Sequence, residues 1–169
     1  MKKMLVLTLV LVFALSGLAL AADSNEGNIK QIGVWNVSSI DQEGDNNLAE
    51  VKQEGDSNGA YVYQNDFQSL NKVETQVDQA GKFNQAFVWQ YGSMANDMAR
   101  DRKVNVVQSG EYNTAFVVQA IGGQSTAWVN QSGVKNQANQ WQSHELSHKW
   151  ESAQITQTGT ANTALQTQL

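Results

Sequence analysis

The chain has 169 residues, no cysteine and no proline, and its 16 acidic and 11 basic residues give a formal net charge of −5. An acidic chain does not suit nucleic acid, whose phosphates need basic partners, and the absence of cysteine excludes disulfide stabilisation. Proline removes a hydrogen bond from a β-ladder, so its absence favours a chain of mostly paired strands. Abundant Gln, Asn, Gly and Ala are typical either of disorder or of stacked β-structure.

Residues 1–21 have the features of a secretory signal peptide. Two lysines precede an apolar run that ends in small residues at 19–21. A membrane anchor is the alternative, but the run is short and no stop-transfer charges follow it. We therefore expect a secreted mature chain that begins near Ala22, with a short N-terminus at 22–24 and no membrane span.

The rest of the chain repeats one seven-residue motif in which alternate residues are constant in type. Asn47 to Gln53 reads N-L-A-E-V-K-Q and Asn58 to Gln64 reads N-G-A-Y-V-Y-Q, so Asn, Ala, Val and Gln share one face of an extended chain. Spacing is constant inside each strand–turn–strand unit and variable between units, which predicts that each unit forms one coil of a repeat array. The six expected units are 25–46, 47–72, 73–101, 102–124, 125–150 and 151–169.

Three residue types recur at constant places in the units. All twelve strands end on Gln, every turn has Gly in its second place, and every second strand begins on Asn. We expect the amides to form ladders along the stack and the glycines to supply a positive φ in tight arches. The ladder residues are Gln31, Gln42, Gln53, Gln64, Gln79, Gln90, Gln108, Gln119, Gln131, Gln142, Gln157 and Gln168 with Asn36, Asn58, Asn84, Asn113, Asn136 and Asn162. The turn residues are Gly33, Gly55, Gly81, Gly110, Gly133 and Gly159.

The pattern predicts an all-β fold, a cross-β solenoid of six coils whose strands form two facing parallel sheets. Coils would lie about 4.8 Å apart, and small inward residues would let the sheets approach to about 10 Å. Arg102 and Glu151 stand where an inward residue is expected, so we predict that their strands begin one residue later. Gln140 and Gln166 replace valine in the last two coils, which should make that end more polar inside and less stable.

The unit S/N-x5-Q-x-G-x2-N-x-A-x3-Q resembles the curlin repeat, from which the secreted amyloid fibres called curli are built. The resemblance extends over nearly the whole mature chain. It implies a solenoid subunit, either major subunit or nucleator, that leaves the bacterium through an outer-membrane export pore and polymerises at the cell surface with its paralogue. Familiar curlins carry a Gly-rich leader where this chain has only residues 22–24, so either the export route differs or the imperfect first unit replaces the leader. The best match is the fifth unit, with Ser125, Gln131, Gly133, Asn136, Ala138 and Gln142.

Polymerisation is also expected without the resemblance. The ends of a solenoid expose backbone groups that soluble repeat proteins cover with capping elements, and we see no cap beside the first or the last unit. We therefore predict a homo-polymer, the secreted structural subunit of a functional amyloid fibre for biofilm matrix and surface adhesion that grows by end-to-end stacking. The alternative is a soluble secreted β-solenoid that binds a ligand or acts as an adhesin without polymerising.

The outward faces of the two kinds of strand differ. First strands present mainly charged and amide side chains, whereas second strands present an apolar, largely aromatic row. This row would either form ladders that stiffen the sheet or leave an exposed stripe for bundling and adhesion. It comprises Tyr61, Tyr63, Phe87, Trp89, Phe116, Val118 and Trp141.

No catalytic residue, cofactor site or structural metal site is expected, and we predict that the chain is not an enzyme. His144 to His148 has the H-E-x-x-H spacing of zinc proteases, but that chemistry needs a long helix, and the motif lies in a short connection between coils. Incidental metal binding at the two histidines stays open. An ice-binding array is not favoured, because the threonines form no single outward column. A calcium-binding β-helix is not favoured either, because its repeated Gly-Asp nonapeptide is absent.

Overall fold

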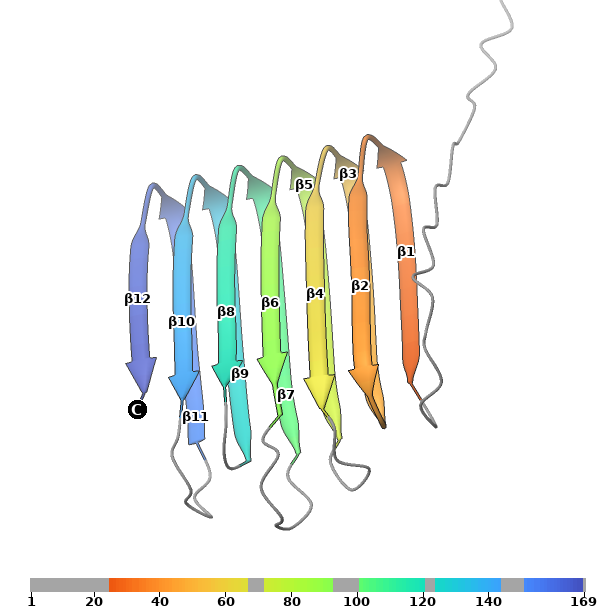
Figure 1. Cartoon of the computed structure of the whole chain (residues 1–169). Helices are drawn as coiled ribbons and strands as arrows, with labels where there is room; N and C mark the ends of the chain where they lie inside the picture. Colours follow the sequence, from red (N-terminus) through yellow and green to blue (C-terminus); the bar gives the residue numbers. More distant parts are fainter. Residues whose placement is uncertain (1–24, 67–71, 93–100, 121–123, 144–150, 169) are drawn as a thin grey trace, which may run out of the picture.

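The computed structural model shows a flat stack of six coils, numbered 1 to 6 along the chain (Figure 1). It describes residues 25–66, 72–92, 101–120, 124–143 and 151–168. The predicted signal peptide and the connection with His144 and His148 lie outside these residues. Among the described residues there is no helix of the length and apolarity that a membrane crossing requires.

Each coil contributes its first strand to one six-stranded parallel sheet and its second strand to the other, which confirms the predicted all-β solenoid. The first sheet has the order β1-β3-β5-β7-β9-β11, and the second has the order β12-β10-β8-β6-β4-β2. The first-sheet strands are β1 (Glu26–Val34), β3 (Asn47–Asp56), β5 (Val73–Lys82), β7 (Arg102–Glu111), β9 (Ser125–Val134) and β11 (Glu151–Thr160). The second-sheet strands are β2 (Val37–Gly44), β4 (Gly59–Asp66), β6 (Gln85–Tyr91), β8 (Thr114–Ala120), β10 (Gln137–Ser143) and β12 (Thr163–Gln168).

The register places like residues over like residues. Gln53 is aligned with Gln31 on one side and with Gln79 on the other, and Gly55 is aligned with Gly33. The same alignment continues through the remaining strand pairs of both sheets. The arches that join the two strands of each coil lie along one edge of the stack in Figure 1, and the register is unchanged although the connections between coils differ in length.

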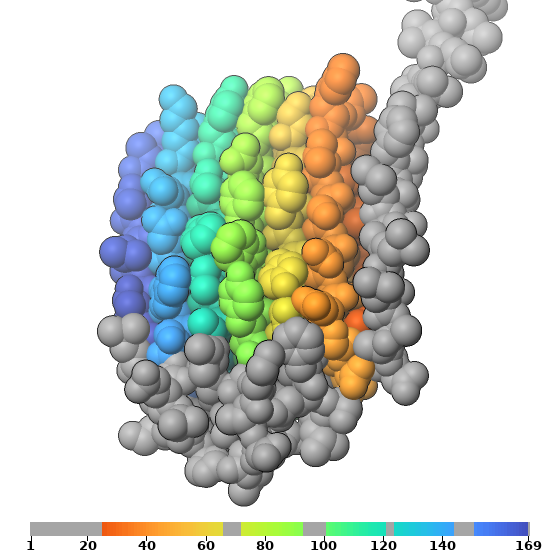
Figure 2. All heavy atoms as spheres, viewed as in Figure 1, coloured from red at the N-terminus to blue at the C-terminus, as the bar shows by residue number. Residues whose placement is uncertain are grey.

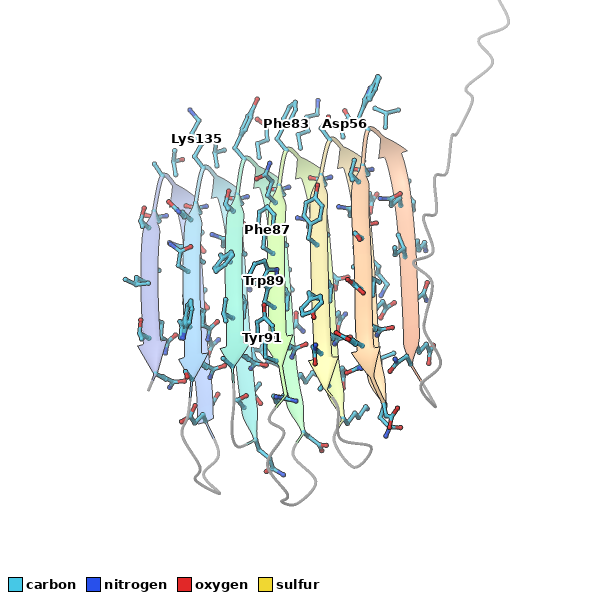
Figure 3. The ribbon with its side chains drawn as sticks, in the orientation of Figure 1. Asp56, Phe83, Phe87, Trp89, Tyr91 and Lys135 are labelled. Atoms are coloured by element: carbon cyan, nitrogen blue, oxygen red, sulfur yellow. The ribbon has the colours of Figure 1, made fainter. Side chains whose placement is uncertain are left out.

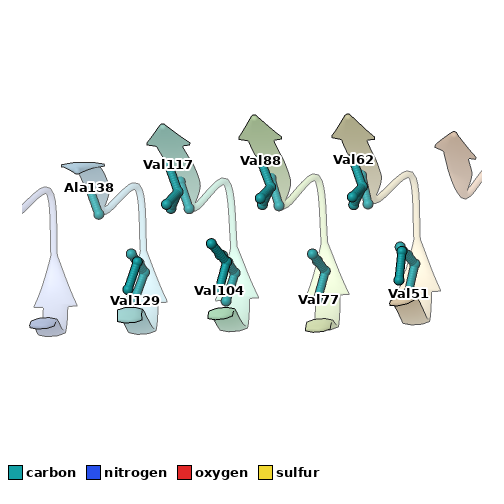
Figure 4. Close-up of a cluster of buried hydrophobic side chains, with 14 of the residues drawn as sticks. Val51, Val62, Val77, Val88, Val104, Val117, Val129 and Ala138 are labelled. Atoms are coloured by element: carbon teal, nitrogen blue, oxygen red, sulfur yellow. The ribbon is translucent and has the colours of Figure 1, made fainter. Parts of the chain in front are cut away.

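The core is a thin layer of small apolar side chains between the two sheets (Figure 4). Val51 and Val77 project from the first sheet toward Val62 and Val88 of the second, and all four are buried. Alanines two residues earlier on the second strands are fully buried as well. Each buried valine contributes about 1.5–3 kcal/mol to stability.

The prediction that two strands begin after Arg102 and Glu151 is wrong. β7 begins at Arg102, which is 3% exposed, and β11 begins at Glu151, which is half-buried. The guanidinium of Arg102 donates a hydrogen bond to the backbone carbonyl of Tyr91, at the end of β6. The N–H of Glu151 donates to the carbonyl of Gln124 at 2.9 Å. Burial of the arginine is tolerated because a hydrogen bond accompanies its charge.

Candidate functional site

Two ladders of glutamine run along the stack inside the solenoid. In the first sheet, Gln31 Nε2 donates to Gln53 Oε1 at 2.7 Å, and Gln53 Nε2 donates to Gln79 Oε1 at 2.8 Å. The same 2.8 Å bond leads on to Gln108, Gln131 and Gln157. The second ladder joins Gln42, Gln64, Gln90, Gln119, Gln142 and Gln168 at 2.8 to 3.1 Å. Every bond in both ladders points from one coil to the next toward the C-terminus.

The glutamines also tie the two sheets together. Gln79 Nε2 donates to the carbonyl of Gly59 at 2.9 Å, and Gln108 Nε2 donates to the carbonyl of Gln85 at 2.9 Å. Second-strand glutamines bond back across the core, as Gln64 Nε2 does to the carbonyl of Leu48 at 3.0 Å. In these glutamines both amide hydrogens are used, one along the stack and one across it, and a buried amide is stabilising only when it is satisfied in this way.

The asparagine ladder at the arches runs in the opposite direction. Asn58 donates to Asn36 Oδ1 from its backbone N–H at 3.0 Å and from its side chain at 3.2 Å. Asn58 Nδ2 also reaches the carbonyl of Glu54, four residues earlier in the same arch, at 3.3 Å. Each asparagine therefore closes its own arch and binds the preceding coil. The repeats of this bond involve Asn84, Asn113, Asn136 and Asn162.

The arch glycines are required by crowding as well as by backbone conformation. Gly55 has φ +110, and a Cβ added there would lie 2.1 Å from the carbonyl oxygen of Gly81 in the next coil. The same overlap, at 2.0 to 2.1 Å, occurs at Gly33, Gly81, Gly110 and Gly133. Gly159 in coil 6 differs, because its nearest neighbour would be Asn162 Nδ2 at 3.5 Å. At Gly159 only the positive φ of 111° requires glycine within this chain.

The arches contain a second left-handed residue that the sequence analysis missed. β3 continues through Gly55 to Asp56, and the chain bends at Ser57, which has φ 57. Strain at a non-glycine residue of this kind costs about 1–3 kcal/mol, and backbone bonds such as Ser57 N–H to the Val34 carbonyl at 2.9 Å offset it. The residues at this place have no common type, so no sequence signal reveals it. They are Trp35, Ser57, Phe83, Tyr112, Lys135 and Ala161.

A further arch lies between coils 1 and 2, and the sequence contains a motif that predicts it. Gln42 to Asn47 reads Q-E-G-D-N-N and repeats the Q-E-G-D-S-N of the second unit's turn. Gly44 has φ 94, and Asn47 N–H donates to Asn25 Oδ1 at 3.0 Å, as in the other asparagine pairs. Residues 43–46 are therefore a second arch rather than a free connection.

Aromatic side chains lie on the outer face of the second sheet, as Figure 3 shows for Phe87 and Trp89 of β6, and Figure 2 shows the same face with all atoms as spheres. Tyr61 and Phe87 stack with ring centroids 5.2 Å apart and planes 7° apart, and Phe87 lies 6.4 Å from Phe116. These contacts run along the stack, as the stiffening interpretation expects. Trp89 and Trp141 nevertheless keep more than two-fifths of their surface exposed.

The prediction that Val118 belongs to the exposed row is wrong. Val118 is 3% exposed, because it is aligned between Trp89 on β6 and Trp141 on β10. Two large indoles on either side of a small residue cover it. Its burial depends on its neighbours in other coils and not on its own position along the strand.

Charged side chains lie on the outside of the first sheet. Glu74 accepts from Lys103 Nζ at 2.9 Å and lies 3.5 Å from Lys72 Nζ. The Lys103 hydrogen bond holds the pKa of the Glu74 carboxyl below its ordinary value, although partial burial opposes this shift. Within the described ranges no group of three or more His, Cys, Asp or Glu could hold a metal ion.

The two terminal coils leave the stack open. Among the described strands, β1, β2, β11 and β12 each have a neighbour on one side only. Gln157 Nε2, in the last rung of its ladder, is buried and has no acceptor among the described residues. The polar interior predicted for the C-terminal end is also present, since Gln140 is 1% exposed and neither of its amide atoms has a described partner.

The repeats of the first two coils match a known family of repeats. The curlin associated repeat model matches residues 22–55 and 44–66, which include coils 1 and 2. Coils 3 to 6 continue the same register, with Gln on Gln, Gly on Gly and an asparagine at each arch. No curated protein and no solved structure matches the chain. Residues 22–66 are thus curlin associated repeats, and the remaining coils extend the same pattern, which supports a curli-type structural subunit.

Proposed function

We propose that the chain is the self-assembling subunit of an extracellular curli-like fibre, in which coil 6 of one copy stacks on coil 1 of the next. Such a fibre would form part of the biofilm matrix and would mediate adhesion to surfaces. The expected partners are further copies of the chain, a major-subunit or nucleator paralogue, and an outer-membrane export pore. The match to the curlin associated repeat supports this assignment, and the geometry of the terminal coils supports the mode of growth.

One observation carries the proposal: the buried Nε2 of Gln157 has no acceptor among the described residues. In all five preceding rungs of that ladder this atom donates to the glutamine of the following coil. A buried donor without a partner costs about 1–3 kcal/mol. Gln31 of a second copy, stacked in the same register, would place its Oε1 where this donor needs it.

A junction in that register would repeat the contacts between coils of one chain. Gln157 and Gln168 would donate to Gln31 and Gln42 of the second copy. Asn36 of that copy would donate twice to Asn162. At about 1 kcal/mol net for each bond, these four amide bonds alone contribute about 4 kcal/mol, and the backbone ladders of two sheets add to them. No charged residue of coil 1 would meet a charged residue of coil 6, so no like charges oppose the junction.

The first test is assembly of the purified mature chain from Ala22, diluted out of denaturant. We expect a lag phase, then fibres in electron micrographs with reflections near 4.8 and 10 Å, the spacings of stacked strands and facing sheets. A β-rich chain that stays monomeric at high concentration would contradict the proposal and support the soluble alternative.

A proline on the outer strand provides a sharper test. Glu151 N–H points inward to Gln124, so by alternation the N–H of Thr156 points away from β9. Thr156→Pro should leave the coil folded but prevent the next copy from pairing, because proline is tolerated where the N–H faces solvent. The matched variant Thr156→Val should assemble like the parent. Thr156→Pro added in small amounts to the parent should also stop growing fibres, since its coil 1 still fits their open coil 6.

A further inference from the structure

The arches of the two terminal coils share a property that the inner coils lack. Four outward places in each arch are exposed or half-buried, and in coils 2 to 5 at least one of them is charged. The charged residues are Glu54 and Asp56 in coil 2, Lys82 in coil 3, Glu111 in coil 4 and Lys135 in coil 5. Figure 3 labels Asp56 and Lys135 on this edge of the stack. The corresponding places in coils 1 and 6 carry no charge at all.

Coil 1 has large apolar residues at all four places. We call Ile32, Val34, Trp35 and Val37 the first-arch patch. Their exposed fractions are 52%, 51%, 83% and 54%, which makes this the densest group of exposed large hydrophobic side chains in the described part of the chain. Single exposed apolar residues need no explanation, but four in one arch indicate a contact surface.

Coil 6 has small, methyl-bearing residues at the same four places. We call Thr158, Thr160, Ala161 and Thr163 the last-arch patch, and all four are exposed. The register between neighbouring coils aligns these places one to one, as it aligns Ile32 with Glu54 and Val34 with Asp56. A second copy that continues the stack would therefore place Trp35 over Ala161 and Val34 over Thr160.

We propose that the first-arch patch is a docking surface for the last-arch patch of a second copy, and that this apolar seam selects the correct end-to-end junction. This inference rests on the proposed function, because it assumes that copies stack. Small residues opposite a large indole leave room for the ring, and neither side brings a charge that would have to lose its water. Within the chain, Phe83 and Tyr112 already stack across neighbouring arches at 4.9 Å, so arch side chains do pack along this edge.

Accessibility of Trp35 tests the seam directly. In a variant that keeps Trp35 as the only tryptophan, with phenylalanine at the other four positions, we expect acrylamide quenching to fall and emission to shift to the blue on assembly. The matched control keeps only Trp128, which is 47% exposed on the outer face of coil 5, away from the junction. Its quenching should not change. Equal quenching of Trp35 before and after fibre formation would overturn the inference.

Exchange of charges across the seam supplies a second, independent readout. Trp35→Lys and Ala161→Glu should each raise the soluble concentration left after assembly about tenfold, because each puts a charge against an apolar surface. The double variant should recover much of this loss, since the two new charges would face each other across the junction. Losses that simply add in the double variant would contradict direct contact.

These outcomes separate the seam from the fibre itself. If the parent chain forms no fibres, the proposed function fails. If the parent forms fibres while Trp35 stays exposed and the charge variants assemble normally, only the seam is wrong. Tyr112→Ser, at the place of Trp35 in coil 4, controls for a general loss of apolar surface at the arches, and it should not change the quenching of Trp35.

Discussion

The inner and terminal coils contain the same repeated unit but differ in how completely it is buried. Ala60, Ala86 and Ala115 of the second sheet are fully buried, whereas Ala164, at the same place in β12, is half-buried. Gln108 is 1% exposed, whereas Gln168 is half-buried. The unit therefore carries no complete core of its own. Its burial comes from the coil on either side, so a terminal coil would become like an inner coil if, as proposed, another copy stacked on it.

The largest effect is expected at the arch glycines. A Cβ at Gly81 would lie 2.0 Å from the carbonyl oxygen of Gly110, in addition to the strain of φ +110. Gly81→Ala should destabilise the chain by about 4 kcal/mol or more, whereas Gly159→Ala should add only backbone strain of about 1–3 kcal/mol. Denaturant unfolding in the non-assembling Thr156→Pro background measures the difference.

The same pair of variants tests whether coil 6 becomes an inner coil in the fibre. In a fibre, the Gly33 carbonyl of the next copy would approach Gly159 as closely as Gly110 approaches Gly81. Fibre yield, measured by thioflavin fluorescence and by sedimentation, should then fall for Gly159→Ala as severely as for Gly81→Ala. Normal assembly of Gly159→Ala would show that coil 6 never becomes an inner coil.

The next largest effect concerns the rungs of the glutamine ladder. Gln79→Met would remove the acceptor of Gln53 Nε2 and the donors to Gln108 Oε1 and the Gly59 carbonyl, which should cost about 2–5 kcal/mol. Gln31→Met removes the donors to Gln53 Oε1 and to the part-buried Ser38 Oγ but leaves no ladder donor without its acceptor, and should cost only about 1 kcal/mol. Unfolding midpoints of the two variants test this ranking, and equal losses would contradict it.

A smaller effect of opposite sign is expected in coil 5. Gln140→Val should stabilise the chain by about 1–2 kcal/mol, because both amide atoms are buried without a described partner and β8 presents Val117 beside it. The control is Gln142→Val, two residues along the same strand. It would break the bonds to Gln119 and Gln168 and should be destabilising. Unfolding midpoints that shift in the same direction would show that strand propensity, and not amide satisfaction, sets the effect.

The smallest effect is expected on the charged outer face. The pKa of Glu74 is lowered mainly by the hydrogen bond from Lys103, so its stabilisation is present above the ordinary value of 4.5 and is lost as pH falls through the lower folded-state pKa. The pair is partly exposed and screened by solvent, so Glu74→Gln should cost about 0.5 kcal/mol or less at neutral pH. Unfolding midpoints at pH 7 and pH 3 measure it. The matched control is Glu54→Gln, a carboxylate without an ion pair to any described residue, which should change the unfolding midpoint at pH 7 less than Glu74→Gln does.

Much of the fold could be predicted because the local pattern and the stacked arrangement demand the same residues. Period-2 alternation with Ala and Val inside indicated strands, and identical amides at constant spacing indicated in-register stacking. The turn at Gln42 to Asn47 could also have been predicted from its sequence, which repeats that of the second unit's turn, but it was overlooked. The burial of Arg102 and Val118 could not be predicted from the sequence. For Arg102 it depends on the Tyr91 carbonyl, and for Val118 it depends on Trp89, and both of these residues belong to another coil.

By itself the sequence determined the number of coils, the inward residues and the places of the amides, because these follow from periodicity along one strand. Only the tertiary structure decided the opposite directions of the Gln and Asn ladders, the donor left over at Gln157 and the alignment of the arches. The physical reason is that each of these properties depends on an atom in the adjacent coil, 20 or more residues away along the chain. Stacking brings that atom into reach, and no local pattern specifies which of its hydrogen bonds remain free.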